Sequence, residues 1–206
     1  MDELNWPLML GAGLIASASP GPGTLGIAGT SMRYGRRAGL SFSAGVLAGS
    51  NIWSATAAFG FGAILLTHVW MLETVRYCGG GYLIWLAVKS LRSAIVSGAG
   101  KISDIALSSN HFMAGLSIHI TNPKPILFFG TLFSIGVPAG TSVSELALLV
   151  IIIGLNNAVV FFTYAFLFSN GIMARAYARA RRWFEGVFAG LFGLAGVQIL
   201  TMRMTQ

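Results

Sequence analysis

The sequence is poor in charge and contains a single cysteine. Charged side chains make up 9% of its 206 residues against 55% hydrophobic residues, and the mean hydropathy is +0.74. A soluble domain carries about 25% charged residues, so this chain could not solvate a surface of its own size. The lone Cys78 excludes a disulfide framework, a paired-thiol redox site and a multi-cysteine metal site. The composition therefore indicates an integral membrane protein.

Long runs without any formal charge predict the membrane spans. Each run is long enough for a transmembrane helix, which takes about 17 to 25 residues. Four runs are free of charge: 4–32, 38–72, 146–174 and 186–202. Two further hydrophobic stretches are 74–90, with basic residues near its ends, and 112–137, with Lys124 near its middle. We predict an all-α membrane protein with six transmembrane helices.

Basic residues are concentrated on one side of these predicted spans. Only Arg76, Arg203 and Lys124 lie elsewhere. We predict that the protein lies in the cytoplasmic (inner) membrane. The positive-inside rule then places the basic loops in the cytoplasm and both termini outside. Because the first charges are Asp2 and Glu3, we expect the first helix to be retained and not cleaved as a signal peptide. The same bias accounts for the net charge of +7, so we predict no nucleic-acid binding.

Two P-x-P pairs divide the chain into similar halves. Pro20 and Pro22 lie in the first predicted span, and Pro123 and Pro125 lie in the fourth, half the chain away. A weaker sign of the same repeat is the G-x-N pattern that occurs in both the second and the fifth predicted span. We predict a first three-helix repeat over 1–92, a cytoplasmic linker over 93–110 and a second repeat over 111–206, all in one membrane domain. Since three helices are an odd number, the second repeat is inverted.

The prolines predict that the first and fourth helices are broken. Proline removes a backbone donor and clashes with the preceding turn, and such backbone is tolerated in a membrane only where it faces protein or a wet cavity. The helix that restarts after a break directs N–H groups at an anion. Inverted repeats with breaks at matching positions are typical of secondary transporters, although two structural kinks without a ligand remain the alternative.

The breaks and nearby polar residues are the candidate site. A lysine near the middle of a span must find carbonyls, water or a substrate anion, and the predicted spans contain no acid to pair with Lys124. Lys124 and His119 are the candidates for proton coupling, with carbonyl capping and simple packing as their alternatives. Asn51, Asn156 and Asn157 either contact the substrate amino group or form hydrogen bonds between helices. The candidate substrate-binding residues are Pro20, Gly21, Pro22, Asn51, Asn122, Pro123, Lys124, Pro125, Asn156 and Asn157.

Other chemistries find little support in the sequence. Gly21, Gly23 and Gly26 match the dinucleotide pattern G-x-G-x-x-G, but Pro22 has no N–H for a phosphate and no acid follows about 20 residues later. We find no nucleophile with a base and no cluster of metal ligands. We therefore predict no enzyme activity, cofactor or metal.

Several motifs resemble the LysE-type amino-acid exporters, including their homoserine and threonine (RhtB-like) branch. They are Pro20-Gly21-Pro22, the G-R-R-A-G-L of 35–40, the G-x-x-Y-L-x-W-L-A-x-K-x-L-R of 79–92, Asn122-Pro123-Lys124 with the following 126–129, and the R-R-W that opens the sixth helix. The resemblance implies a six-helix, proton-driven exporter of amino acids or close derivatives that forms a homodimer in the bilayer. Where many members carry an acid after the glycine matching Gly49, this chain has Ser50 and Asn51. Export of another small solute, or a non-transporting membrane subunit, is the alternative.

Overall fold

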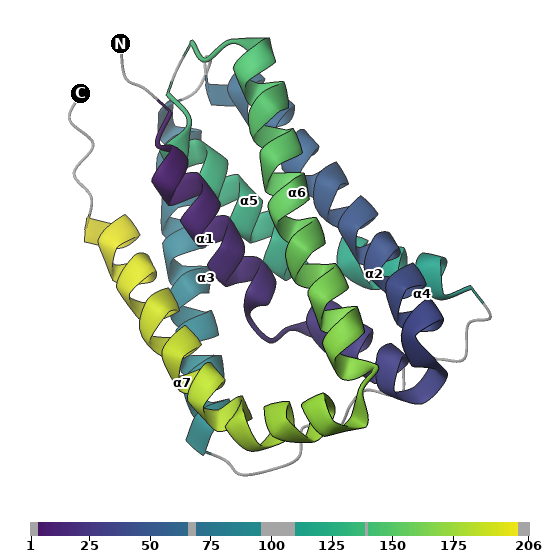
Figure 1. The fold of residues 1–206 in the computed structure, drawn as a ribbon. Helices are drawn as coiled ribbons and strands as arrows, with labels where there is room; N and C mark the ends of the chain where they lie inside the picture. The colour runs from purple at the N-terminus through teal and green to yellow at the C-terminus, as the bar shows by residue number, and fades with distance from the viewer. Residues whose placement is uncertain (1–3, 66–68, 96–109, 139, 202–206) are drawn as a thin grey trace.

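The computed structural model describes residues 4–65, 69–95, 110–138 and 140–201, and the regular elements within these ranges are all α-helices. Figure 1 shows them as an elongated bundle. In chain order the helices are α1 (Trp6–Ala18), α2 (Pro22–Leu65), α3 (Val69–Ile95), α4 (His111–Ile120), α5 (Pro123–Gly136), α6 (Val143–Phe168) and α7 (Gly171–Thr201).

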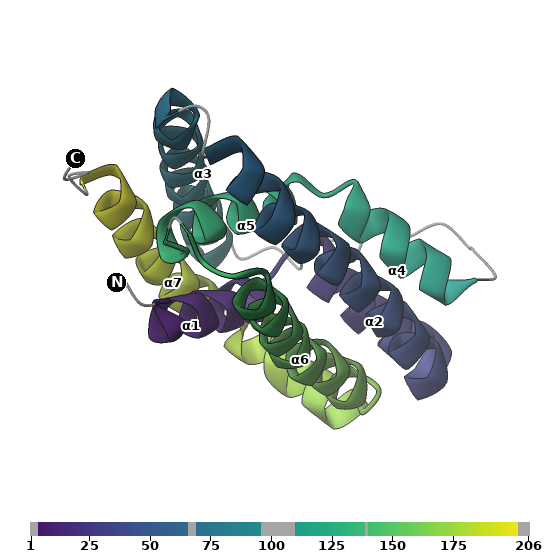
Figure 2. The same ribbon diagram turned by 90° about the horizontal axis from the view of Figure 1, so that it is seen from above.

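The helices pack mainly as neighbours from different parts of the chain. Helix α3 lies along α7, and α2 lies along both α4 and α6. Seen from above, α3 and α7 form one side and α2 and α4 the other, with α5 between them and α1 beside α6 (Figure 2). Helix α5 thus lies near the middle of the molecule, where it contacts α1, α2 and α3, whereas α1 packs against α6 and α5.

A sharp turn at Gly35 divides α2 into two segments. The backbone of Gly35 is not helical, with φ 82° and ψ −178°. The segments on either side run in opposite directions in Figure 1, and Gly39 of the second lies against Ser31 of the first. The turn falls in the basic stretch between the first two predicted spans, so the long α2 contains the end of one predicted span and most of the next.

Replacing Gly35 with alanine is expected to lower the free energy of unfolding by about 1 to 3 kcal/mol, because this region of backbone conformation is accessible almost only to glycine. The melting temperature in detergent is the measurement. Gly81→Ala is the matched control, since Gly81 lies in regular helix with no heavy atom near the position of a new Cβ. Equal melting temperatures for the two variants would contradict the assignment of a strained turn at Gly35.

Helices end or begin beside both P-x-P pairs. Helix α1 ends at Ala18 and α2 begins at Pro22, while α4 ends at Ile120 and α5 begins at Pro123. Proline suits the first positions of a helix, since the N–H that it lacks has no helical partner there. Asn122 caps α5 by accepting a hydrogen bond from the backbone N–H of Lys124.

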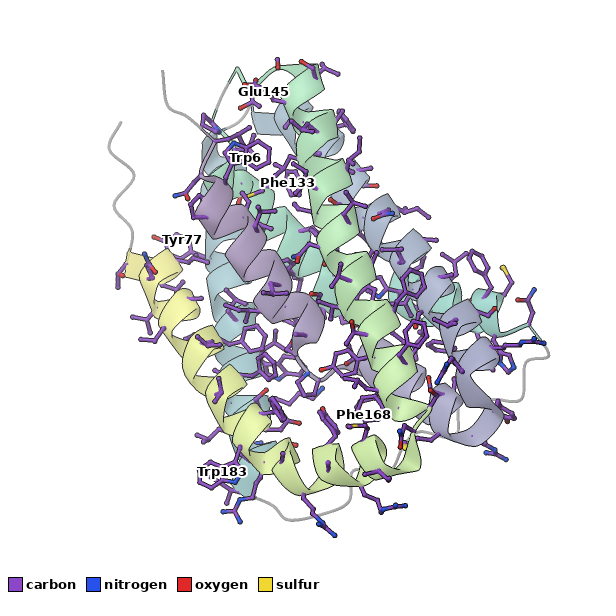
Figure 3. All side chains as sticks on the ribbon, viewed as in Figure 1. Trp6, Tyr77, Phe133, Glu145, Phe168 and Trp183 are labelled. Atoms are coloured by element: carbon purple, nitrogen blue, oxygen red, sulfur yellow. The ribbon has the colours of Figure 1, made fainter. Side chains whose placement is uncertain are left out.

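The two ends of the bundle differ in their charges. Helix α6 begins with a capping box between Ser142 and Glu145, and Figure 3 shows Glu145 near Trp6 at one end and Trp183 at the other. Arg36 at the turn of α2 donates to Ser169 at the end of α6, with 3.4 Å between Nε and Oγ. These contacts gather the turn of α2 and the junction of α6 with α7 at the Trp183 end. The exposed basic residues of this end are Arg33, Arg36, Arg37, Lys89, Arg92, Arg175, Arg179 and Arg182.

Two of the helices are long and apolar enough to cross a membrane on their own composition, within the described ranges. They are Val143–Phe168 and Arg182–Thr201. The part of α7 that precedes this span runs across the bottom of Figure 1 before the helix turns up beside α3. Among the described residues, both helices that meet this criterion of length and composition therefore lie in the C-terminal half.

Glycines set the separation of α2 and α4. A side chain on Gly45 would overlap the carbonyl oxygen of Phe112, and one on Gly115 would overlap the carbonyl oxygen of Phe42. The two backbones therefore touch directly, and close approach through small residues is the usual way in which membrane helices pack. This contact lies one turn from His119, so it also positions that side chain.

Candidate functional site

Lys124 connects the junction of α4 and α5 with the junction of α1 and α2. Its side chain reaches from the first turn of α5 to the end of α1, where Nζ donates to the carbonyl oxygens of Ala16 at 3.0 Å and Ser19 at 3.3 Å and to the hydroxyl of Ser19. These are three acceptors for an ammonium group that has three N–H bonds. The C-terminus of α1 and the N-terminus of α5 meet here. The helix dipole makes the first favourable for a cation and the second favourable for an anion.

Three further side chains donate to carbonyls at the end of α1. The hydroxyl of Tyr164 donates to the carbonyl oxygen of Ala18 at 2.7 Å, and that of Thr24 donates to Ser19 O at 3.3 Å. Ser19 Oγ itself donates to Ala16 O at 2.8 Å. The last carbonyls of a helix have no partner within it, so these contacts stabilise a helix end inside the protein. Two of the donors, Lys124 and Tyr164, come from the second half of the chain.

A small cavity, lined by both polar and apolar residues, lies beside these helix ends. Its volume is about 50 Å³, and a water needs about 10 to 15 Å³ by the same measure, so a few waters would fit. Asn157 donates to Ser50 Oγ at 2.9 Å, and within the described ranges its Oδ1 and both ring nitrogens of His119 have no hydrogen-bond partner. Both residues are buried, with 3% and 7% of their surface exposed. Such groups favour ordered water or a polar ligand in the cavity. Its lining includes Gly13, Ala16, Ser17, Ser19, Gly21, Gly23, Thr24, Val46, Ser50, His119, Asn122, Lys124, Pro125, Phe128, Phe129, Asn157 and Phe161.

A second, larger pocket lies on the other side of Lys124. Its volume is about 360 Å³, and it is open between α3, α7 and the junctions of α1 with α2 and of α4 with α5. Gly21, Asn122 and Lys124 line both pockets, so they form the wall between them. The second pocket also brings together Lys89 from α3 and Glu185 from α7.

The candidate residues from the sequence are distributed over these two pockets. Gly21, Asn122, Lys124, Pro125, Asn157 and His119 line the small cavity, and Pro20, Pro22 and Pro123 line the second pocket. Two asparagines belong to neither lining. Asn51 is exposed and lies against Gly154, and Asn156 lies beside Gly13 with Nδ2 at 3.5 Å from the carbonyl oxygen of Leu10.

Glu185 was missed as a candidate residue, because it lies one position outside the sixth predicted span. Glu185 stands directly before the uncharged run 186–202 and so escaped a search for charge-free spans. In the structure α7 continues through it, only 4% of its surface is exposed, and it lines the same pocket as Lys124. Ser93 Oγ donates to Glu185 Oε1 at 3.0 Å. The available signal was its setting among the apolar residues Trp183, Phe184 and Val187.

The described residues contain no group of three or more His, Cys, Asp or Glu side chains that could hold a metal ion. The polar groups on the residues that line both pockets are hydroxyls, amides, carbonyls, two ammonium groups, one carboxylate, one imidazole and one indole N–H. This set of groups suits recognition of a small polar molecule by hydrogen bonds and charge.

Comparison with known proteins gives the family. The sequence profile described as LysE type translocator matches residues 14–203. The threonine efflux protein of Escherichia coli strain K12 is 29% identical over 196 residues, which cover 92% of this chain and 94% of that protein. The leucine efflux protein of Enterobacter sp. strain 638 is 28% identical over 190 residues, covering 92% and 89%. The homoserine/homoserine lactone efflux protein of Salmonella typhimurium strain LT2 is 27% identical over 128 residues, covering 62% of each.

No solved structure gives a significant match. The profile covers most of the chain, including both P-x-P pairs and Lys124. It confirms the resemblance seen in the sequence motifs and places the chain among membrane translocators, which are not a class of enzymes. The chain belongs to the LysE type translocator family.

Proposed function

We propose that the protein exports an amino acid or a close derivative across the cytoplasmic membrane, and that the substrate passes between the two helix breaks. The single observation that carries this proposal is the position of Lys124, a cation held between the ends of α1 and α5 with a pocket on either side. The names of the relatives, which are threonine, leucine and homoserine efflux proteins, support the same substrate class.

The chain forms six spans in two inverted repeats in this proposal. The first and fourth spans are each made of two helices, which are α1 with the start of α2, and α4 with α5. The rest of α2, α3, α6 and α7 supply the other four. The packing supports the symmetry, because α1 contacts α6 and α4 contacts α2, so the first short helix of each half lies on the second span of the other half. Of the linker predicted over 93–110, residues 96–109 lie outside the described residues.

The basic end of the bundle faces the cytoplasm in this arrangement, with the start of α1 and the end of α7 directed to the outside. This follows from the positive-inside rule applied to the exposed arginines of the Trp183 end. The pocket that contains Glu185 then opens toward the cytoplasm, since Lys89 and Ser93 lie near the end of α3 that leads into the linker.

Lys124 exchanges partners during transport in the proposed mechanism. In the present state its three N–H bonds have acceptors at the end of α1. A substrate carboxylate that enters beside α5 offers a stronger, charged acceptor, and hydrogen bonds between ions are roughly twice as strong as neutral ones. Release of the α1 carbonyls then loosens the contact between the two halves, as alternating access requires. His119 and Lys124 are the proposed carriers if a proton is coupled to this exchange.

The experiment that tests the function is counterflow in proteoliposomes that contain the purified protein. The panel consists of L-threonine, L-leucine, L-homoserine, L-lysine and L-glutamate, each radiolabelled. We expect accumulation of at least one neutral amino acid above the level in protein-free liposomes. The protein must be monodisperse and show a cooperative melting transition. If such a preparation accumulates none of the five amino acids, the result would contradict amino-acid export and favour another solute or a non-transporting subunit.

A further inference from the structure

The pocket between α3, α7 and the helix breaks holds charges of both signs. Lys89, Lys124 and Glu185 all line it, and they come from three different helices. Its volume of about 360 Å³ falls within the range of roughly 300 to 1,000 Å³ that is usual for small-molecule sites. The small cavity on the other side of Lys124 is several times smaller.

Glu185 is the carboxylate of this pocket and is almost completely enclosed. It is 4% exposed, and Ser93 supplies one hydrogen bond to its Oε1. A buried carboxylate is costly unless cations or hydrogen bonds compensate its charge. Lys124 and Lys89 line the pocket with it, so the three groups form one local charge system.

The two lysines are held over aromatic faces. Lys89 Nζ is 4.9 Å from the centre of the Trp85 ring, and Lys124 Nζ is 5.9 Å from that of Phe192. Both distances fall within the usual limit of about 6 Å for a cation–π contact. Trp85 and Phe192 also line the pocket, so they fix the direction of the ammonium groups and give the pocket an apolar wall for a substrate side chain.

We propose that this pocket binds the substrate as a zwitterion from the cytoplasmic side, with Glu185 accepting hydrogen bonds from its ammonium group and Lys89 and Lys124 donating to its carboxylate. The inference rests on the proposed function and deepens it by naming a second set of contact residues and the charge class of the substrate. Each charge of the zwitterion would meet a group of opposite charge in the pocket lining, so neither charge would be without a counter-ion.

The balance of charge predicts which amino acids enter. Two lysines and one glutamate give the described lining a surplus of one positive charge. A neutral zwitterion leaves this surplus unchanged, whereas L-lysine or L-arginine would add a second positive charge in a partly buried site. We therefore expect neutral amino acids to be accepted and basic ones to be rejected.

Glu185→Gln tests the assignment, because it removes the charge and keeps the shape. Counterflow of labelled L-leucine and L-threonine is measured with two competitors that have a hydroxyl in place of the ammonium, 2-hydroxy-4-methylpentanoate and 2,3-dihydroxybutanoate. The wild type is expected to be inhibited by the amino acids and not by the hydroxy acids. In the variant we expect the apparent affinity for the amino acid to fall by about 10- to 100-fold, which is the range for losing a hydrogen bond to a charged group. We also expect the hydroxy acids to compete as well as the amino acids do.

Two further variants keep the outcome interpretable. Glu145→Gln removes one negative charge from the exposed capping box of α6, where glutamine can also accept the hydrogen bond of the N-cap residue. This variant should leave transport, and the rejection of hydroxy acids, unchanged. Glu185→Asp keeps the charge and should retain the rejection of hydroxy acids even where its affinity is lower. If Glu185→Gln transports with wild-type affinity and still rejects hydroxy acids, the inference falls and the proposed function stands. If the wild type itself neither transports nor is thermally stabilised by any amino acid of the panel, both fall.

Discussion

Replacing Lys124 with methionine is expected to reduce amino-acid counterflow by at least roughly 100-fold, while the protein still inserts and purifies. Removing one partner from a buried charge contact costs about 3 to 5 kcal/mol, and 3 kcal/mol corresponds to a factor of about 150. The methionine side chain is one atom shorter than that of lysine and has no N–H bond, so neither the α1 carbonyls nor a substrate carboxylate would find a side-chain donor there.

The same change also has a structural cost in the empty protein. The carbonyl oxygens of Ala16 and Ser19 lose the donor that they have from Lys124. A lower melting temperature is therefore expected as well, and transport must be expressed per folded molecule. Arg179→Met is the matched control, since it removes one exposed positive charge from α7 outside both pockets. If Lys124→Met transports within about twofold of this control, Lys124 does not belong to the substrate path.

Replacing Gly115 with alanine is expected to lower the free energy of unfolding by about 3 kcal/mol, at the upper end of the cost of overpacking a core. The new Cβ would overlap the carbonyl oxygen of Phe42 and lie 3.2 Å from the backbone nitrogen of Val46. Because the obstacle is backbone, no side-chain rotation relieves it, and α4 must move away from α2. The melting temperature in detergent should fall by about 6 to 12 °C at roughly 2 to 4 °C per kcal/mol.

Gly190→Ala is the control for this effect. No heavy atom lies within 4 Å of a Cβ built at Gly190, so the exchange should leave the melting temperature unchanged or raise it, since alanine favours a helix over glycine. Equal stability of Gly115→Ala and the wild type would show that α2 and α4 are farther apart than in this structure.

The sequence was most informative about where polar backbone meets the membrane interior. Charge-free runs predicted the helical membrane class, and the proline pairs directed attention to Gly21, Asn122 and Lys124, which the structure brings together in the wall between the two pockets. This works because a lysine or a broken backbone inside a span is costly and therefore needs a specific environment. The role of these residues in binding stays a proposal.

The side of a helix on which a residue lies was harder to predict. The repeated G-x-N pattern favoured Asn51 and Asn156, whereas the structure turns their neighbours Ser50 and Asn157 toward the cavity and pairs them at 2.9 Å. Adjacent helix residues point about 100° apart, so an error of one position exchanges the cavity for the outer surface. A single sequence does not fix the rotation of a helix to that accuracy.

Glu185 and Gly35 show two other limits of prediction from the sequence. The uncharged run that predicts the sixth span begins one residue after Glu185, so the predicted span does not include this enclosed acid. Gly35 is one of 27 glycines, and its φ of 82° depends on packing between segments that the sequence does not reveal. Both features are set by tertiary contacts and not by local composition.

The capping of α1 by later residues has a consequence for synthesis of the protein. Lys124 is 108 residues beyond Ala16, and Tyr164 is 146 residues beyond Ala18. At translation rates of about 5 to 20 residues per second, these donors leave the ribosome roughly 5 to 30 s after the carbonyls that they serve. Until then the end of α1 has only local donors, such as the hydroxyls of Ser19 and Thr24, and the carbonyl oxygen of Ala18 needs water or another donor as its partner.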